Sequence, residues 1–217
     1  MGIVDTRAQY RHLFDIYVPI ALAVFALIVL AVLLAVLVYR RRPPERAARW
    51  HENDRLEGAY ALLLCAVVAF LLYLTFSTEH KVDTVSAGER PQLVVNVTGA
   101  KWEWHFNYPG YGIDLYSGAV GHQDLVVPTG EAIRFRLTSV DVIHAFWIPQ
   151  LRYKHDLIPG STQNVTLTFS RPGLFAGECA EFCGLLHSDM VFNARAVSPA
   201  AFASWAQSER SASGAVP

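Results

Sequence analysis

The segment "KWEWHFNY", residues 101–108, decides the fold of the larger part of the chain. Aromatic side chains alternate with polar ones along it, at Trp102, Trp104, Phe106 and Tyr108. Successive side chains of a strand point to opposite faces of a sheet, so this period of two predicts a strand with one aromatic face directed into a core.

Similar alternation continues on both sides of this segment. The strand candidates are "PQLVVNVTG" (91–99), "DLVVPTG" (124–130), "AIRFRLT" (132–138) and "NVTLTF" (164–169). Short period-two segments separated by Gly, Pro and Asn predict an all-β sandwich or barrel over residues 81–217. Near the end, "SPAAFASWAQSER" (198–210) predicts a helix with Ser198 as its cap, and a frayed end follows Glu209.

The N-terminal part of the chain has a different composition. Of the 217 residues 53% are hydrophobic, and two runs, 16–39 and 58–78, carry no charge. Each run exceeds the 18 or so apolar residues that mark a transmembrane helix. Too little chain remains to bury two such helices in a soluble core. We therefore predict a two-helix membrane anchor over residues 1–80 and a separate β domain over residues 81–217.

The charges that flank the two runs predict the orientation of the anchor. The first run is too long for a cleaved signal peptide and is followed by the basic segment "YRRRPPERAARW" (39–50). Arginines concentrate between the two runs, which places this connection on the cytoplasmic side. Both termini and the β domain are then expected on the outer, periplasmic face of a bacterial plasma membrane.

The segment "GECAEFCGLLHSDM", residues 177–190, carries metal-ligating chemistry. Its candidate ligands are Cys179, Cys183, His187 and Met190. The two cysteines alone are also compatible with a disulfide or with plain packing. Thiolate, imidazole and thioether together favour copper, because zinc rarely takes a thioether. A mononuclear blue-copper site needs one cysteine, whereas two thiolates can bridge two copper ions, each completed by a histidine. A second histidine is then required, and His144 in "TSVDVIHAFWIP" (138–149) is the best candidate.

These features together resemble a known family. Two N-terminal membrane helices, an outer β domain, "DVIHAFWIP", "KHDLIPG" and "GECAEFCGLLHSDM" are similar to subunit II of cytochrome c oxidase, of the haem–copper oxidase superfamily. The resemblance covers residues 10 to 205. It implies a cupredoxin-like fold with a dinuclear copper centre, CuA.

The resemblance also implies a role for each site residue. His144 and His187 would each bind one copper, and Cys179 and Cys183 would bridge both. Met190 and the backbone carbonyl of Glu181 would be the weak ligands.

Three further residues gain roles from the resemblance. The Glu181 carboxylate would reach a magnesium ion at the interface with subunit I. Trp102 would receive electrons from cytochrome c, although a packed aromatic residue is the alternative. Glu57 would lie at the mouth of a proton pathway, although a solvated acid at a helix start is the alternative.

The function implied is that of the electron-input subunit of a terminal respiratory oxidase. Electrons from cytochrome c would pass through CuA to haem in subunit I, where O2 is reduced to water and protons are pumped. The expected partners are subunit I, subunit III, cytochrome c and membrane lipid, with no nucleic acid. From His80 onward the chain has twelve acidic and ten basic residues. This small excess of negative charge predicts weak electrostatic steering of a basic donor.

Other functions fit parts of the pattern. A CuA subunit of a nitric oxide reductase, and a copper-binding module without an oxidase partner, remain open on sequence grounds. The two membrane helices count against the copper domain of a nitrous oxide reductase. The full set of copper ligands counts against a quinol oxidase subunit II.

Overall fold

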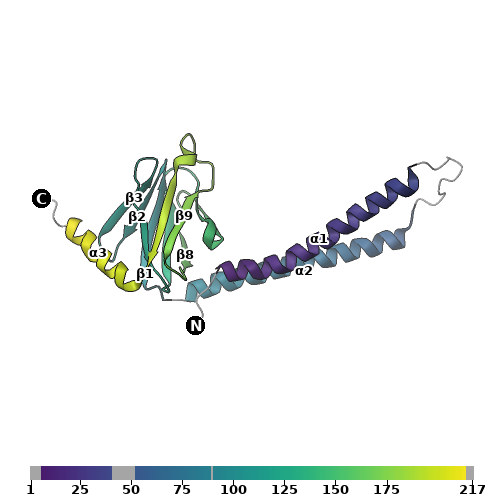
Figure 1. Ribbon diagram of the computed structural model, residues 1–217, viewed down its shortest axis with the longest axis horizontal. Coiled ribbons are helices and arrows are strands. Elements are labelled where there is room, and N and C mark those ends of the chain that lie inside the picture. Colours follow the sequence, from purple (N-terminus) through teal and green to yellow (C-terminus); the bar gives the residue numbers. More distant parts are fainter. Residues whose placement is uncertain (1–5, 41–51, 89, 214–217) are drawn as a thin grey trace. The chain divides into compact units, whose positions relative to one another are not determined.

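The computed structural model describes residues 6–40, 52–88 and 90–213, and the chain forms two units (Figure 1). One unit is helical and spans Gln9–His80, and the other contains Lys81–Pro217 together with the first residues of the chain. The four arginines Arg41, Arg42, Arg46 and Arg49, which contribute to the predicted orientation, lie outside the described residues.

The helical unit contains most of α1 (Thr6–Tyr39) and most of α2 (Asp54–Gly88). Both helices are long and apolar enough to cross a membrane, and none of the side chains in their most apolar windows is buried. At about 1.5 Å per residue each helix exceeds a ~30 Å hydrocarbon core. Both helices are longer than the predicted apolar runs, 16–39 and 58–78, because polar residues at the end of each run continue the same helix. The Tyr17 hydroxyl joins them by donating to the Leu71 carbonyl at 2.6 Å.

The β unit is a sandwich of two five-stranded sheets, which confirms the predicted fold class. The first sheet has the order β3-β2-β1-β5-β8 and the second β4-β10-β9-β6-β7. Strands β1 and β5 pair in parallel, as do β4 and β10, and the other neighbours are antiparallel. The strands are β1 (Leu93–Ala100), β2 (Glu103–Tyr108), β3 (Ile113–Gly118), β4 (Leu125–Pro128), β5 (Ile133–Ser139), β6 (His144–Ile148), β7 (Tyr153–Leu157), β8 (Gln163–Leu167), β9 (Gly173–Cys179) and β10 (Val191–Val197).

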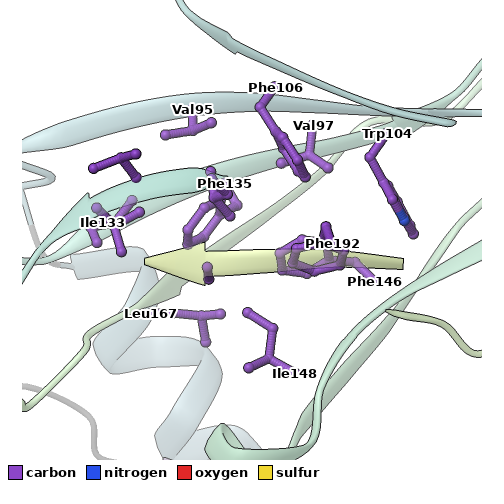
Figure 2. Packing of buried hydrophobic residues seen from close by; sticks show 14 of the residues in the cluster. Val95, Val97, Trp104, Phe106, Ile133, Phe135, Phe146, Ile148, Leu167 and Phe192 are labelled. Carbon is purple, nitrogen blue, oxygen red and sulfur yellow. The ribbon is translucent and has the colours of Figure 1, made fainter. Parts of the chain in front are cut away.

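The core lies between the two sheets and is rich in aromatic rings (Figure 2). Trp104, Phe106 and Tyr108 of β2 are fully buried, as their alternation predicts. Phe192 of the second sheet meets Trp104 edge to face at 5.5 Å and stacks on Phe146 at 4.8 Å. Close contact between rings from both sheets fixes the face of each strand that turns inward.

The predicted alternation differs from the structure at its first residue. Trp102 lies in the turn before β2 and is half-buried, whereas the strand begins at Glu103. The turn lifts Trp102 out of the core and brings it to the end of the sandwich. Its indole is therefore available to the loop that carries the cysteines.

The predicted C-terminal helix is α3 (Pro199–Ser213). The Ser198 hydroxyl accepts the N–H of Ala201 at 3.2 Å, which confirms the predicted cap. Phe202 and Ala206 are buried against the sandwich. The helix continues through Ser213, so the expectation of a frayed end directly after Glu209 is wrong. Residues 210–213 extend the helix by about one turn.

Candidate metal centre

Strand pairing brings the predicted ligands to one end of the sandwich. His144 opens β6 and Cys179 closes β9, and the two strands pair with Phe146 opposite Cys179. The N–H of Ala180 donates to the carbonyl of Ala145 at 3.1 Å and extends this pairing beyond the strand. His144 and Cys179, which are far apart in sequence, therefore lie side by side.

The loop between β9 and β10 supplies the other ligands. It contains a short 3-10 helix, His187–Asp189, and the N–H of Cys179 donates to the carbonyl of Met190 at 3.0 Å, which closes the loop. The indole N–H of the buried Trp104 donates to the same carbonyl at 3.2 Å. The core aromatic face therefore supports the loop from below.

Three side chains, those of His144, His187 and Met190, surround the sulfur atoms of the two cysteines. The Sγ atoms of Cys179 and Cys183 lie 3.9 Å apart. Nδ1 of His144 lies 3.7 Å from Sγ of Cys179, and Nδ1 of His187 lies 3.4 Å from Sγ of Cys183. The thioether of Met190 lies 3.8 Å from Sγ of Cys183. Each sulfur thus has one imidazole beside it.

These separations fit metal binding. Metal–sulfur bonds of about 2.3 Å allow two sulfurs on one metal to lie up to about 4.6 Å apart, and the observed 3.9 Å is within that limit. A disulfide would need about 2.05 Å, and both cysteines are free thiols. The ligand atoms of His144, Cys179 and Cys183 all lie within 4.8 Å of one another, and all three residues are buried. Soft sulfur and imidazole donors in this arrangement suit copper.

The electrostatics of the thiols favour one ionised sulfur. Burial by itself raises the pKa of Cys179, but hydrogen bonds with the His144 ring and the backbone outweigh it and lower this pKa to about 7. Burial and the neighbouring charge of Cys179 raise the pKa of Cys183 to about 12. Burial also opposes the charged form of His144, yet its contacts with Cys179 and Asp141 raise its pKa above the usual value. Burial and the charge of the first sulfur therefore favour the protonated form of the second thiol, and a bound cation would take the place of that proton.

Glu181 lies between the two cysteines and makes two separate contacts. Its backbone carbonyl accepts the Cys179 thiol at 3.3 Å, so this oxygen faces the ligand cluster. Its carboxylate points away and binds the ammonium group of Lys154 at 2.6 Å. Lys154 also lies 3.4 Å from Asp156. The side chain is thus half-exposed and paired with a cation of the same chain.

Trp102 contacts the ligand loop directly. Its indole N–H donates to the carbonyl of Cys183 at 3.2 Å. An ideal Cβ at Gly184 would lie 3.3 Å from the indole ring, and the φ of +118° at this residue is one that favours glycine. The close approach of backbone and indole therefore depends on glycine at this position.

Glu57 belongs to the helical unit and lies in the first turn of α2. Asn53 caps this helix, because its side-chain oxygen accepts the N–H of Leu56 at 3.0 Å. The helix dipole also stabilises a negative charge in the first turn. The geometry fits the solvated acid that the sequence left as an alternative, and the proton-path role stays a prediction.

Asp141 contacts the site and was missed from the sequence. Its Oδ1 lies 2.9 Å from Nε2 of His144 and also accepts the N–H of Val142 at 2.6 Å. Its Oδ2 accepts the N–H of Lys101 at 2.8 Å. Burial opposes ionisation, but these hydrogen bonds outweigh it and lower the pKa of the Asp141 carboxyl. The sequence signals for it are its place three residues before His144 and its position at the start of the motif "DVIHAFWIP".

Comparison with known proteins identifies the family. Residues 119–197, which include all the predicted copper ligands, match the family described as "Cytochrome C oxidase subunit II, periplasmic domain". Cytochrome c oxidase subunit 2 of Schizosaccharomyces pombe is 30% identical over 89% of this chain and 86% of its own length. The chain belongs to the cytochrome c oxidase subunit II family.

Two other relatives define the extent of the match. The probable cytochrome c oxidase subunit 2 of Streptomyces coelicolor is 35% identical over 68% of this chain, and the match spans 57% of that protein's length. The crystal structure of the periplasmic domain of subunit II from Bradyrhizobium japonicum has a TM-score of 0.54 and 32% identity, and covers 57% of this chain and 96% of its own. The chain thus spans little more than half the length of some curated subunit II relatives.

Proposed function

We propose that this chain is the electron-input subunit of a terminal respiratory oxidase. It would take electrons from cytochrome c and deliver them to haem in subunit I, where O2 is reduced to water and proton pumping is coupled. The observation that carries the proposal is the buried pair of free thiols 3.9 Å apart, each next to its own histidine. Membership of the subunit II family supports it.

The residues that would hold two copper ions are all in one cluster. Cys179 and Cys183 would bridge the ions, His144 and His187 would complete one ion each, and Met190 with the carbonyl of Glu181 would bind weakly. The copper pair, when bound, supplies a one-electron carrier. The chain supplies rigidity, because the loop is closed by backbone bonds and supported by Trp104, so the ligands keep their places when the charge changes.

Burial also contributes to the proposed role. His144 and Met190 are fully buried, and the two cysteines are nearly so. Water is therefore kept from the sulfurs, which protects the thiolates and lowers the local dielectric. Trp102 is half-buried and bonded to the Cys183 carbonyl, so we propose it as the residue through which electrons reach the ligand loop.

We also propose that the site lies on the outer face of a bacterial plasma membrane. Residues 1–80 would span the membrane twice, and residues 81–217 would form the CuA domain outside. We further propose that Glu181 exchanges Lys154 for magnesium when the chain docks on subunit I, since carboxylates are the hard ligands that Mg2+ prefers. Glu57 is proposed for the mouth of the proton pathway, and subunit III for the same complex.

The experiment that tests the function is isolation of the intact complex. Affinity purification through this chain should recover a haem-containing subunit I and an activity that oxidises reduced cytochrome c with O2. The same preparation from Cys183→Ser should keep the subunits and lose the activity. A purified complex that reduces nitric oxide but not O2 would overturn the proposal in favour of a nitric oxide reductase. A preparation without a haem subunit would overturn it in favour of an isolated copper-binding module.

A further inference from the structure

The Asp141 carboxylate joins two segments that meet at the candidate metal centre, its own loop before β6 and the turn before β2. It accepts hydrogen bonds from the His144 ring, from the backbone of Val142 and from the backbone of Lys101, at 2.9, 2.6 and 2.8 Å. Lys101 is followed by Trp102, whose indole bonds to the Cys183 carbonyl. One carboxylate is therefore bonded to a ligand residue and to the chain segment that carries Trp102.

The bond to His144 fixes which ring nitrogen can bind metal. Because Nε2 carries the hydrogen that Asp141 accepts, the lone pair lies on Nδ1, which faces Sγ of Cys179 at 3.7 Å. A carboxylate on the far nitrogen of an imidazole ligand orients the ring and makes it a stronger donor. The fully buried ring cannot obtain the same bond from water.

His187 lacks this support. Its ring lies 3.4 Å from Sγ of Cys183 and contacts Phe182 at a centroid distance of 5.7 Å. Within residues 90–213 as described, no carboxylate lies within hydrogen-bonding distance of the His187 ring. The two imidazoles of the site are therefore unequal, and one of them is anchored by a negative charge.

We propose that Asp141 is a positioning residue that holds His144 on the metal pair and stabilises its oxidised state. The inference rests on the proposed copper function. A stronger donor favours the higher metal charge, and a nearby negative charge acts in the same direction. Asp141 therefore lowers the midpoint potential of the site, and its removal raises it.

The chain offers a matched control on the other side of the first sheet. Asp114 of β3 binds Nε2 of His105 at 2.6 Å, and His105 lies on β2 between the core residues Trp104 and Phe106. Strand alternation therefore directs this Asp–His pair outward, away from the core face. Asp114→Asn removes the same charge from the same kind of pair without touching the ligand cluster.

The test uses the full chain in detergent, loaded with copper, as wild type, Asp141→Asn and Asp114→Asn. Copper per chain, electron paramagnetic resonance and the spectroelectrochemical midpoint potential are measured. Asp141→Asn should lower copper affinity roughly 10- to 100-fold. If the oxidised state loses tenfold more affinity than the reduced one, the potential rises by about 59 mV. Asp114→Asn should match wild type in copper content, in spectrum and in midpoint potential.

Several outcomes would decide the matter. If Asp141→Asn binds two coppers with an unchanged midpoint potential, the proposed role of Asp141 is overturned while the proposed copper function stands. Fewer than two coppers in wild type would instead overturn the proposed function. If Asp141→Asn loses copper, an unchanged unfolding temperature of the metal-free chain supports positioning, and a lowered one contradicts it. Asp141→Glu keeps the charge and should return the potential toward wild type.

Discussion

Gly177→Ala tests the packing that supports the metal centre. Gly177 of β9 pairs with Phe192 of β10, and an ideal Cβ at Gly177 would lie 2.1 Å from Cζ of the Phe192 ring. Carbon atoms in contact are about 3.5–4.0 Å apart, so the ring would have to move by about 1.5 Å. It cannot do so freely, because it stacks on Phe146 at 4.8 Å and meets Trp104 at 5.5 Å.

The expected cost is about 1–3 kcal/mol of unfolding free energy, as for overpacking in other cores. The assay is urea unfolding of the metal-free fragment from residue 90 onward, which contains all ten strands of the sandwich. The periplasmic domain of subunit II from Bradyrhizobium japonicum, which matches 57% of this chain, was crystallised without its membrane anchor. Gly110→Ala is the matched control, because nothing lies within 4 Å of its Cβ, and it should cost less than about 0.5 kcal/mol.

A double variant sharpens the test. Phe192→Ala should cost about 3–5 kcal/mol by leaving a cavity. Combined with Gly177→Ala it should cost clearly less than the sum, because the new methyl group no longer meets a ring. Equal effects of Gly177→Ala and Gly110→Ala, or strict additivity in the double variant, would refute this account of the β9–β10 contact.

Three further predictions concern the site and the anchor. Trp102→Phe keeps an aromatic ring but removes the N–H that donates to the Cys183 carbonyl, a hydrogen bond worth about 1 kcal/mol. Copper content should stay unchanged, whereas stopped-flow reduction by cytochrome c should slow several-fold. Equal reduction rates would leave Trp102 as a packing residue. Glu181→Gln should retain the two-copper spectrum and weaken manganese binding at the proposed magnesium site of the complex, whereas Cys183→Ser should alter the copper spectrum and leave manganese binding unchanged. A reporter active only in the cytoplasm and fused after Pro217 should be silent, and an active one would contradict the proposed topology.

Sequence patterns predicted β1, β2, β4, β5 and β8 and missed the other five strands that the structure describes, although β3 and β10 also alternate between buried and exposed positions. β5 and β8 alternate clearly, and their inward residues are buried as expected. β6, "HAFWI", is buried at four of its five positions, so it has no period of two to detect. β9, "GLFAGEC", has a small Gly177 where Phe192 needs space, which weakens its signal.

The ligand set was visible in the sequence because its residue types are rare and closely spaced. The structure places His144, Cys179, Cys183, His187 and Met190 together, and their metal roles remain proposals. Contacts between distant segments were not predictable in the same way. Lys154 reaches Glu181 only because β7 lies beside β6 in the second sheet. The contact between the Asp141 carboxylate and the His144 ring becomes visible only in the structure.

The most direct test of the copper proposal is the metal content and electron paramagnetic resonance of the full chain reconstituted with copper. The arrangement of Cys179, Cys183, His144 and His187 predicts two coppers per chain. In the mixed-valence state it also predicts a hyperfine pattern from one unpaired electron shared equally by both nuclei, because both thiolates would bridge the two ions in the proposed centre. One copper per chain, a pattern from a single nucleus, or preferential binding of zinc would contradict the account.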